Sequence, residues 1–264
     1  MTQDERLEFL IEFFKAESKD YTKLCVPADR DGKRQLLRGL MNVRMPGPMS
    51  AEVLAVQDAY LRERAKEKGV VRLDNISVIH DGLSVWQGDI TRLAVDAIVN
   101  AANSAMLGCF VPGHNCIDNC IQTYAGVQMR AECNRQMKLL KQEYGQRYVQ
   151  PTAIPLLTDG YNLPAKKVVH IVGPVVTGSL TQKHKTELAA CYTNTLDLCM
   201  REGLKSLAFC CISTGVFHFP NEEAAEIAVN TVRGWQETQG NVIERIIFNV
   251  FKDEDKKCYE NLIQ

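Results

Sequence analysis

The sequence predicts a three-layer α/β/α fold that is preceded by a helical segment. Beyond about Val70, short apolar runs alternate with longer stretches of helical periodicity. This alternation is typical of a sheet whose two faces are both covered by helices. Before Val70, apolar residues recur only at helical spacing. We therefore divide the chain into an N-terminal helical extension, residues 1–69, and an α/β domain, residues 70–264.

Two helices are predicted in the extension. The first carries a row of apolar residues at helical spacing: Leu7, Leu10, Ile11 and Phe14. A break follows at residues 45–48, where the sequence Met-Pro-Gly-Pro does not continue a helix. Ser50 is a good N-cap for the second helix, and Gly69 is a good stop for it.

The α/β domain is expected to open with a β-hairpin. Residues 76–80 and 83–86 are two β-prone runs, and Asp81-Gly82 between them is a typical two-residue turn. Five further strands are predicted at residues 97–100, 153–157, 168–172, 206–210 and 245–249. Five helices are predicted at residues 116–125, 128–144, 182–202, 221–236 and 253–261.

The composition excludes several classes of function. The chain has 264 residues and a formal net charge of -1, so it lacks the basic field that holds nucleic acid. No apolar run approaches the roughly 20 residues that span a bilayer. Acidic side chains within residues 1–15 argue against a signal peptide. We therefore expect a cytoplasmic protein that binds neither nucleic acid nor membranes, and whose phosphate-bearing ligands are gripped locally.

Three segments that follow predicted strands carry polar residues, at the edge of the sheet where α/β folds bind ligands. They are Gly88-Asp89-Ile90-Thr91, Asn100-Ala101-Ala102-Asn103 and Ser213-Thr214-Gly215-Val216-Phe217. Taken singly, the first is also compatible with a plain turn and the second with loop capping by Asn side chains. The third can present backbone N–H groups to a phosphate, although its spacing matches neither the P-loop nor the dinucleotide fingerprint.

Taken together and in this order, the three segments resemble the macrodomain family, whose members bind ADP-ribose. The resemblance covers about residues 70–264 and implies a mixed central sheet. It implies that Asp89 accepts a hydrogen bond from the adenine amino group and that Asn103 faces the distal ribose. The loop 213–217 would wrap the diphosphate, with Phe217 against the distal ribose. Phe251 is a candidate for the adenine face, and its alternative is a core aromatic.

The segment after Asn103 departs from the family pattern. In hydrolase-type macrodomains a short glycine run leads to a Val-Asp-Gly helix start, whereas here residues 106–119 form a longer stretch with one His between two Cys. This stretch resembles the zinc-containing microbial branch of the family.

The residue types in this stretch independently favour zinc. Cys109 and Cys116 offer two thiolates, His114 offers an imidazole, and Pro112-Gly113 supplies a turn that lets the three converge. Three protein ligands leave a fourth position open, as in catalytic zinc sites. The alternative is a closed structural site completed by a fourth ligand, Cys120 or Cys133.

The resemblance, together with these candidate zinc ligands, implies a hydrolase that removes mono-ADP-ribose from modified protein side chains. Asn103 would fix the ribose, and Zn²⁺ would polarise or hold a water or a ribose hydroxyl. Asp118 matches the acidic residue of the family's helix-start motif and would position or activate the attacking water. Its alternative is an ordinary first-turn carboxylate favoured by the helix dipole. An Asp or Glu ester is the expected linkage, because carboxylate is a good leaving group.

The partners follow from the resemblance alone. The zinc branch implies a sirtuin-like transferase that modifies a lipoyl-carrier protein, which this chain would then release from ADP-ribose. Two rival functions are a non-catalytic ADP-ribose-binding module with a structural zinc, and deacetylation of O-acetyl-ADP-ribose. The role of the extension is left open between shaping the pocket rim, recruiting the protein substrate and stabilising the fold.

Overall fold

A six-stranded mixed sheet forms the centre of this computed structural model, which describes all of residues 1–264. The strand order is β2-β8-β7-β4-β6-β5, and all neighbours are parallel except β5, which runs antiparallel to β6. The strands are β2 (Leu83–Gln87), β4 (Ala97–Ala101), β5 (Leu156–Asp159), β6 (Lys167–Ile171), β7 (Ser206–Phe209) and β8 (Arg245–Val250). The central strand β7 is buried along its whole length, as expected of a sheet covered on both faces.

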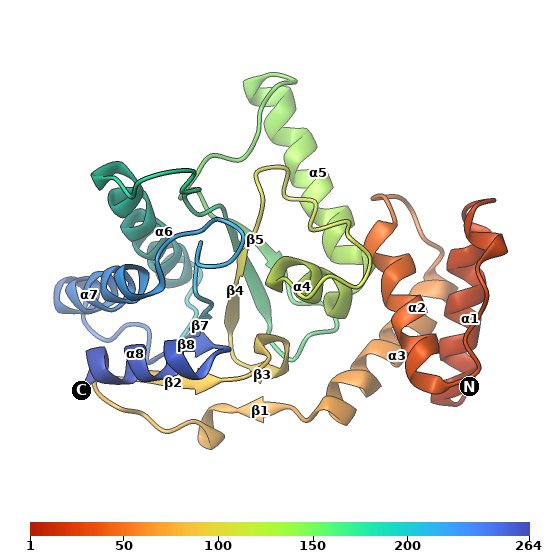
Figure 1. The fold of residues 1–264 in the computed structure, drawn as a ribbon, viewed down its shortest axis with the longest axis horizontal. Coiled ribbons are helices and arrows are strands. Elements are labelled where there is room, and N and C mark those ends of the chain that lie inside the picture. Colours follow the sequence, from red (N-terminus) through yellow and green to blue (C-terminus); the bar gives the residue numbers. More distant parts are fainter.

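Helices cover both faces of this sheet (Figure 1). α4 (Ile117–Ala125) and α5 (Val127–Tyr144) lie on one side, and α6 (Gln182–Arg201) and α7 (Asn221–Gln239) lie on the other. α8 (Asp253–Ile263) packs beside α7 and against β2. The predicted three-layer α/β/α architecture is confirmed.

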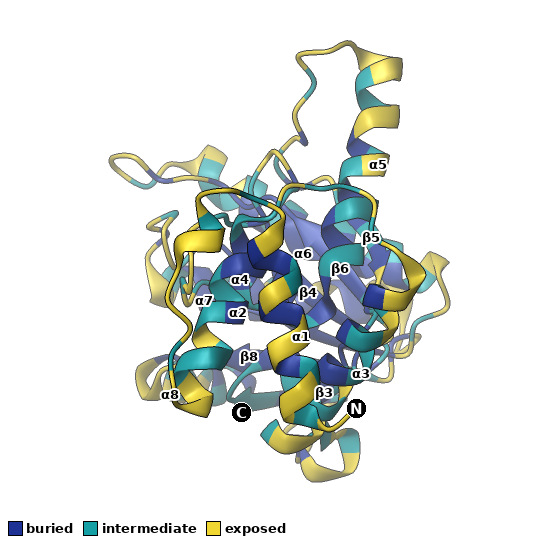
Figure 2. Cartoon of the chain, turned by 90° about the vertical axis from the view of Figure 1, so that its right-hand side faces the viewer, coloured by how far each residue is buried: buried dark blue, intermediate teal, exposed yellow.

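The second half of α5 projects from the body of the molecule and is largely exposed (Figure 2). None of the helices combines the length and the apolar character needed to cross a bilayer.

The N-terminal residues form three helices, one more than the sequence predicted. They are α1 (Gln3–Ala16), α2 (Arg30–Val43) and α3 (Ala51–Lys68). They share a cluster of ten buried apolar residues, which is separate from the cluster of 48 in the α/β domain. Figure 1 shows this bundle beside α4 and α5.

Several short elements lie between the longer helices and strands. Single 3₁₀ turns lie at Tyr21–Lys23, Leu73–Asn75 and Ile90–Arg92. β1 (Val71–Arg72) and β3 (Leu93–Ala94) form a separate two-stranded parallel sheet that was not predicted.

The predicted hairpin at residues 76–86 is wrong. Asp81 and Gly82 do form a turn with positive φ angles of 43° and 77°. However, the residues before it pair only through an isolated bridge between His80 and Leu83. β2 instead pairs in parallel with β8, which satisfies its backbone with a strand from the far end of the chain.

The strand start predicted at Ala153 is also wrong. Ala153 has a φ of +64°, a left-handed conformation that a strand cannot include, and β5 begins three residues later at Leu156. The remaining predicted strands and helices of the α/β domain lie within a few residues of the observed ones.

Candidate functional site

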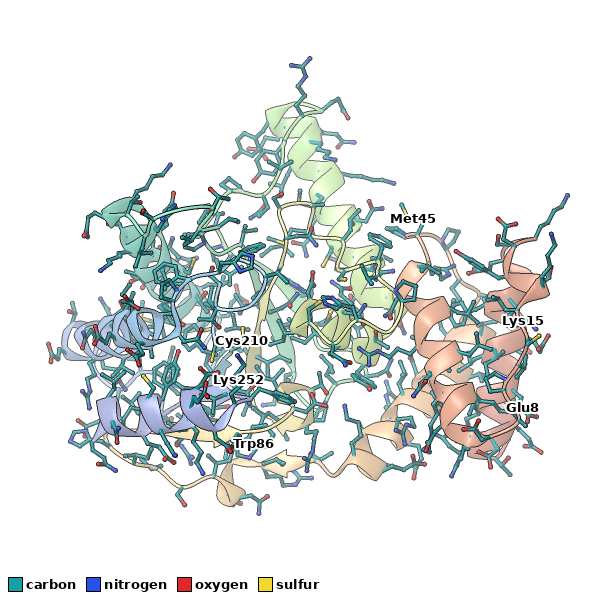
Figure 3. The ribbon with its side chains drawn as sticks, in the orientation of Figure 1. Glu8, Lys15, Met45, Trp86, Cys210 and Lys252 are labelled. Atoms are coloured by element: carbon teal, nitrogen blue, oxygen red, sulfur yellow. The ribbon has the colours of Figure 1, made fainter.

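The carboxyl ends of adjacent parallel strands meet at one edge of the sheet. β2, β8, β7 and β4 are neighbours there, so the loops that follow them share this edge. Figure 3 shows Trp86 at the end of β2, Cys210 directly after β7 and Lys252 after β8 in the same part of the molecule. All three polar segments singled out in the sequence therefore lie at this edge.

Asp89 caps the turn after β2 and is held by two partners. Its Oδ1 accepts hydrogen bonds from the backbone N–H and the hydroxyl of Thr91, at 3.0 and 2.6 Å. Its Oδ2 pairs with Lys68 Nζ at 2.5 Å. Burial acts to raise the pKa of Asp89, but the charge of Lys68 and the hydrogen bonds from Lys68 and Thr91 outweigh it and lower the pKa. The carboxylate is thus kept ionised, as an acceptor.

Lys68 is a site residue that sequence reasoning missed. It lies at the end of α3 in the extension, and its Nζ also sits 3.6 Å from the centroid of the Tyr124 ring. Nothing in the sequence places residue 68 beside residue 89. The sequence indicated only that a helix ends at Gly69, and therefore that Lys68 lies at the end of that helix.

The loop after β7 offers free backbone donors. Ser213 has a φ of +66°, which turns the chain sharply. Within 213–219, only the N–H groups of Thr214, His218 and Phe219 donate to backbone carbonyls. The N–H groups of Gly215, Val216 and Phe217 have no protein acceptor, which is the arrangement that anion-binding loops use.

A second loop, after β6, supports this one and was also missed. Val176 N–H donates to the Phe217 carbonyl at 2.9 Å. Gly173 lies so close that a Cβ there would come within 2.0 Å of Ser213 Oγ. The glycine is therefore required by the close approach of the two loops, a tertiary contact that no local pattern reports.

The three apolar candidate residues at this edge differ in how exposed their side chains are. Phe251 is 79% exposed, so its interpretation as a core aromatic is wrong. Phe217 is partly buried against the main core. The side chain of Ile90 is buried, at 3% exposure, so it can face a ligand only through its backbone.

Asn103 and Asp118 are brought together at the end of β4. Asn103 Nδ2 donates to Asp118 Oδ2 at 3.2 Å and to the Gly108 carbonyl at 3.0 Å. Asn100 Nδ2 donates to the other oxygen, Asp118 Oδ1, at 2.8 Å. Burial raises the pKa of Asp118 to about 6, against the lowering effects of the Asn100 hydrogen bond, the charge of Arg130 and the Asn103 hydrogen bond.

His170 continues this network into the core. Asn100 Nδ2 donates to His170 Nδ1 at 3.0 Å, so the ring proton resides on Nε2, which lies 2.9 Å from Thr158 Oγ1. Complete burial lowers the pKa of His170 to about 3. His170 is thus a neutral core residue, as its place in an apolar strand suggested.

Cys109, His114 and Cys116 form a compact group that could hold a metal ion. Their ligand atoms all lie within 4.8 Å of one another, and Cys109 Sγ lies 3.4 Å from His114 Nδ1. Cys116 is also the N-cap of α4, where its Sγ accepts from Asn119 N–H at 3.4 Å. Burial and the neighbouring Cys109 raise the pKa of the Cys116 thiol to about 12. Two thiols and an imidazole at this spacing fit a zinc ion.

The two candidate fourth ligands lie elsewhere. Cys120 is not part of the group, and its Sγ accepts a hydrogen bond from Arg38 at 3.4 Å. Cys133 is buried, 3.7 Å from His170 Nε2. The group that could hold a metal ion therefore consists of three side chains, and neither Cys120 nor Cys133 joins it.

Comparisons with known proteins identify the family and agree with the fold. A family model described as "Macro domain" matches residues 99–228. A protein of Treponema medium named protein-ADP-ribose hydrolase is 48% identical over all of both chains. A protein of the same name from Staphylococcus aureus is 44% identical over 97% of this chain and 94% of its own. The structure of a Trypanosoma brucei macrodomain in complex with ADP-ribose superposes with a TM-score of 0.64 at 28% identity, covering 83% of this chain and 93% of the other.

Proposed function

Because this chain belongs to the macrodomain family, we propose that it is a protein-ADP-ribose hydrolase that depends on zinc. The observation that carries the proposal is the placement of the Cys109, His114 and Cys116 group directly before α4, the helix whose first turn carries Asp118. The name shared by the relatives from Treponema medium and Staphylococcus aureus supports the reaction class.

Four parts of the edge would hold the ligand. Asp89 accepts a hydrogen bond from the adenine amino group, and Phe251 covers the adenine face. The free N–H groups of the 213–217 loop bind the diphosphate. Phe217 and Asn103 flank the distal ribose. Binding energy from the adenine and diphosphate then fixes the reacting ribose in place.

Hydrolysis needs a water directed at the anomeric carbon. Asp118 accepts a proton from this water as its oxygen bonds to the anomeric carbon, and the side-chain carboxylate departs with the electrons of the broken bond. Asn100 and Asn103 keep both oxygens of Asp118 oriented. Cys109, His114 and Cys116 would hold zinc, which when bound supplies a Lewis acid at its open position.

The substrate we propose is an ester of mono-ADP-ribose with an acidic side chain. Such a leaving group departs as carboxylate and needs little acid assistance. Asn100 and Asn103 both bond to Asp118, and neither bonds to another carboxyl group that could act as an acid. A lipoyl-carrier protein modified by a sirtuin-like transferase remains a prediction that rests on the resemblance alone.

The test is release of ADP-ribose from a protein modified on Asp or Glu. We would compare zinc-loaded protein, chelator-treated protein and the Cys116→Ala variant, with circular dichroism to check that each is folded. We expect turnover only with zinc. Zinc-loaded protein that binds ADP-ribose without turnover would instead establish a binding module, and release of acetate from O-acetyl-ADP-ribose alone would establish the deacetylase.

A further inference from the structure

The extension meets the metal-ligand loop through one helix. We propose that α2 is part of the metal site, and that Arg38 and Asn42 are positioning residues that hold the loop 109–116 in ligand geometry. The proposal rests on the zinc dependence proposed above. It assigns the extension a role at the site.

The loop has little backbone structure of its own. Within residues 109–116 the only backbone hydrogen bond joins His114 N–H to the Val111 carbonyl, at 3.2 Å. Val111, Pro112 and Gly113 are exposed. A segment with so few internal bonds depends on neighbouring side chains for its shape.

Arg38 of α2 contacts this loop both directly and through Asn119. Its Nη2 donates to the His114 carbonyl at 2.6 Å, so it holds the backbone of a ligand residue directly. The same guanidinium donates to Asn115 Oδ1 and Asn119 Oδ1, both at 3.1 Å. Asn119 in turn donates to the carbonyls of Cys109 and Val111, at 3.2 and 2.9 Å. One arginine therefore braces both ends of the loop.

Asn42 lies one turn further along α2 and is fully buried. Its Oδ1 accepts from Gly113 N–H at 2.9 Å, at the turn between the first Cys and the His. Its Nδ2 donates to Thr123 Oγ1 on α4 at 2.5 Å. Asn42 thus ties the tip of the loop to the helix that carries Asp118.

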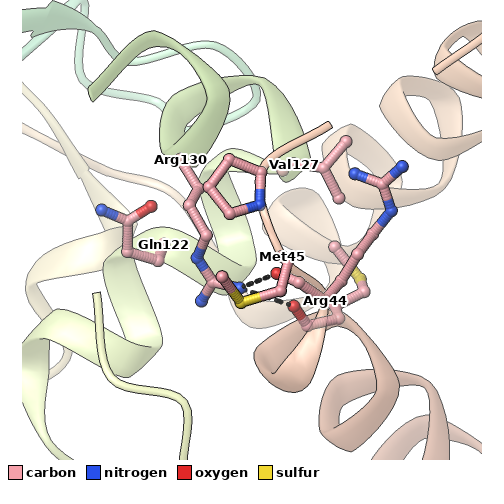
Figure 4. Close-up of a pocket in the computed structure, with 8 residues that line it drawn as sticks. Arg44, Met45, Gln122, Val127 and Arg130 are labelled. Carbon is pink, nitrogen blue, oxygen red and sulfur yellow. Dashed lines mark hydrogen bonds between the residues drawn. The ribbon is translucent and has the colours of Figure 1, made fainter. Parts of the chain in front are cut away.

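Arg130 fixes α2 against the α/β domain (Figure 4). Its Nη1 donates to the carbonyls of Met41, Asn42 and Arg44 at the end of α2, at 3.2, 2.9 and 2.6 Å. Its guanidinium also lies 4.4 Å from the Phe110 ring of the loop. The loop therefore contacts side chains of α2, α4 and α5 while its tip stays exposed, and we infer that its position follows that of α2.

The experiment measures zinc affinity by competition with a chromophoric chelator, which is independent of hydrolysis. Arg38→Ala should weaken zinc binding about tenfold or more, the usual effect of losing a group that orients metal ligands. Arg38→Lys keeps the charge and should fall between Arg38→Ala and the parent. Arg34→Ala is the matched control, because Arg34 lies one turn earlier on α2 and pairs only with Asp31 and Glu67. Its zinc affinity should stay within about twofold of the parent.

A zinc affinity of Arg38→Ala equal to that of the control would overturn the proposal. If the parent itself binds no zinc, the proposed function fails, and hydrogen exchange then tests the positioning role alone. The hydrogen-bonded amides of Gly113 and His114 should exchange at least about tenfold faster in Arg38→Ala than in Arg34→Ala, and equal rates would contradict the positioning role. If Arg38→Ala does not fold, the same comparisons are made with Arg38→Lys.

Discussion

At the scale of single residues, the site depends on carboxylates that are held by fixed donors. Asp118 is bonded through both oxygens to amides, and Asp89 is bonded through both oxygens to Thr91 and Lys68. A carboxylate held in this way has little freedom to rotate, so its acceptor positions are set before a ligand arrives. Each of the two can be tested by substitution.

Asp118→Ala should reduce turnover by about 10²–10⁴-fold, the usual contribution of a general base. The affinity for ADP-ribose, measured by calorimetry, should change only a few-fold. The reason is that the proposed contacts to the adenine and the diphosphate, from Asp89 and the 213–217 loop, do not involve Asp118. Turnover close to that of the parent would show that Asp118 is an ordinary first-turn carboxylate.

Lys68→Ala and Asp89→Ala should not act independently on ADP-ribose affinity. Each should weaken binding, because Lys68 holds the Asp89 carboxylate at 2.5 Å. The double variant should bind more tightly than the sum of the two losses predicts, by about 1 kcal/mol or roughly fivefold, as for other residues in contact. Additive losses would mean that Lys68 does not act through Asp89.

At the scale of elements, the loops after β6 and β7 behave as one unit. The close approach of Gly173 to Ser213 and the hydrogen bond from Val176 to Phe217 hold the loop after β7 in place against the loop after β6. The free N–H groups that would bind a diphosphate therefore owe their position to a segment that makes no predicted ligand contact.

Gly173→Ala should lower both stability and ADP-ribose affinity. The added Cβ would lie 2.0 Å from Ser213 Oγ and 2.8 Å from Ile212 Cγ2, so the loop must shift, at a cost of about 1–3 kcal/mol. Gly178→Ala in the same loop is the control, because a Cβ added there would meet no atom within 4 Å. Thermal unfolding and calorimetry of the two variants decide the matter, and equal behaviour would contradict the prediction.

The elements that sequence reasoning found are those whose signal is local. α3 was predicted from its N-cap Ser50 and its stop Gly69, and the structure uses both. α2 was missed because Gly32 and Gly39 weaken its helical pattern, and its stability comes from packing in the extension.

The candidate site likewise has a part that local sequence predicts and a part that it does not. The Cys109, His114 and Cys116 group could be predicted because its members lie within eight residues of sequence and converge through one turn. The partners of that group could not, because Arg38 reaches the loop from 76 residues away. Long-range pairing also explains the wrong hairpin, since β2 joins a strand from the end of the chain.

At the scale of the whole molecule, a buried polar network runs from the site into the core. It passes from Asp118 through Asn100 and His170 to Thr158, and so joins α4 to β4, β6 and β5. Because His170 is neutral when folded and ionises readily when unfolded, this network makes the stability of the protein depend on pH.

The contribution of His170 to the free energy of unfolding should fall as the pH drops from about 6.5 towards 3. The pKa of His170 is lowered to about 3 in the fold, so in this window the unfolded chain binds a proton that the folded chain does not. The slope from this residue approaches about 1.4 kcal/mol per pH unit. The Asp118 carboxyl, whose pKa is raised to about 6, acts in the opposite direction, and the neighbouring Cys133 stays neutral.

Denaturant unfolding of the parent and of His170→Gln at several pH values isolates this contribution. The variant should lose less stability between pH 6.5 and 4 than the parent does, even if it is less stable at pH 7. Parallel curves for the two proteins would show that His170 does not carry the dependence.

The separation of the two hydrophobic clusters has a thermodynamic consequence. Because the extension keeps its own small core and joins the α/β domain near the loop largely through polar bonds, its detachment would leave most of the larger core in place. Detachment would remove the bonds that hold loop 109–116, so if the proposed zinc site is correct, ion binding and docking of α2 are linked, and linkage is reciprocal. Bound zinc would then raise the equilibrium constant for docking of the extension by the same factor by which docking raises the affinity for zinc. On the proposed zinc dependence, loss of the ion should therefore make residues 1–69 more susceptible to proteolysis, which limited digestion of zinc-loaded and chelator-treated protein would measure.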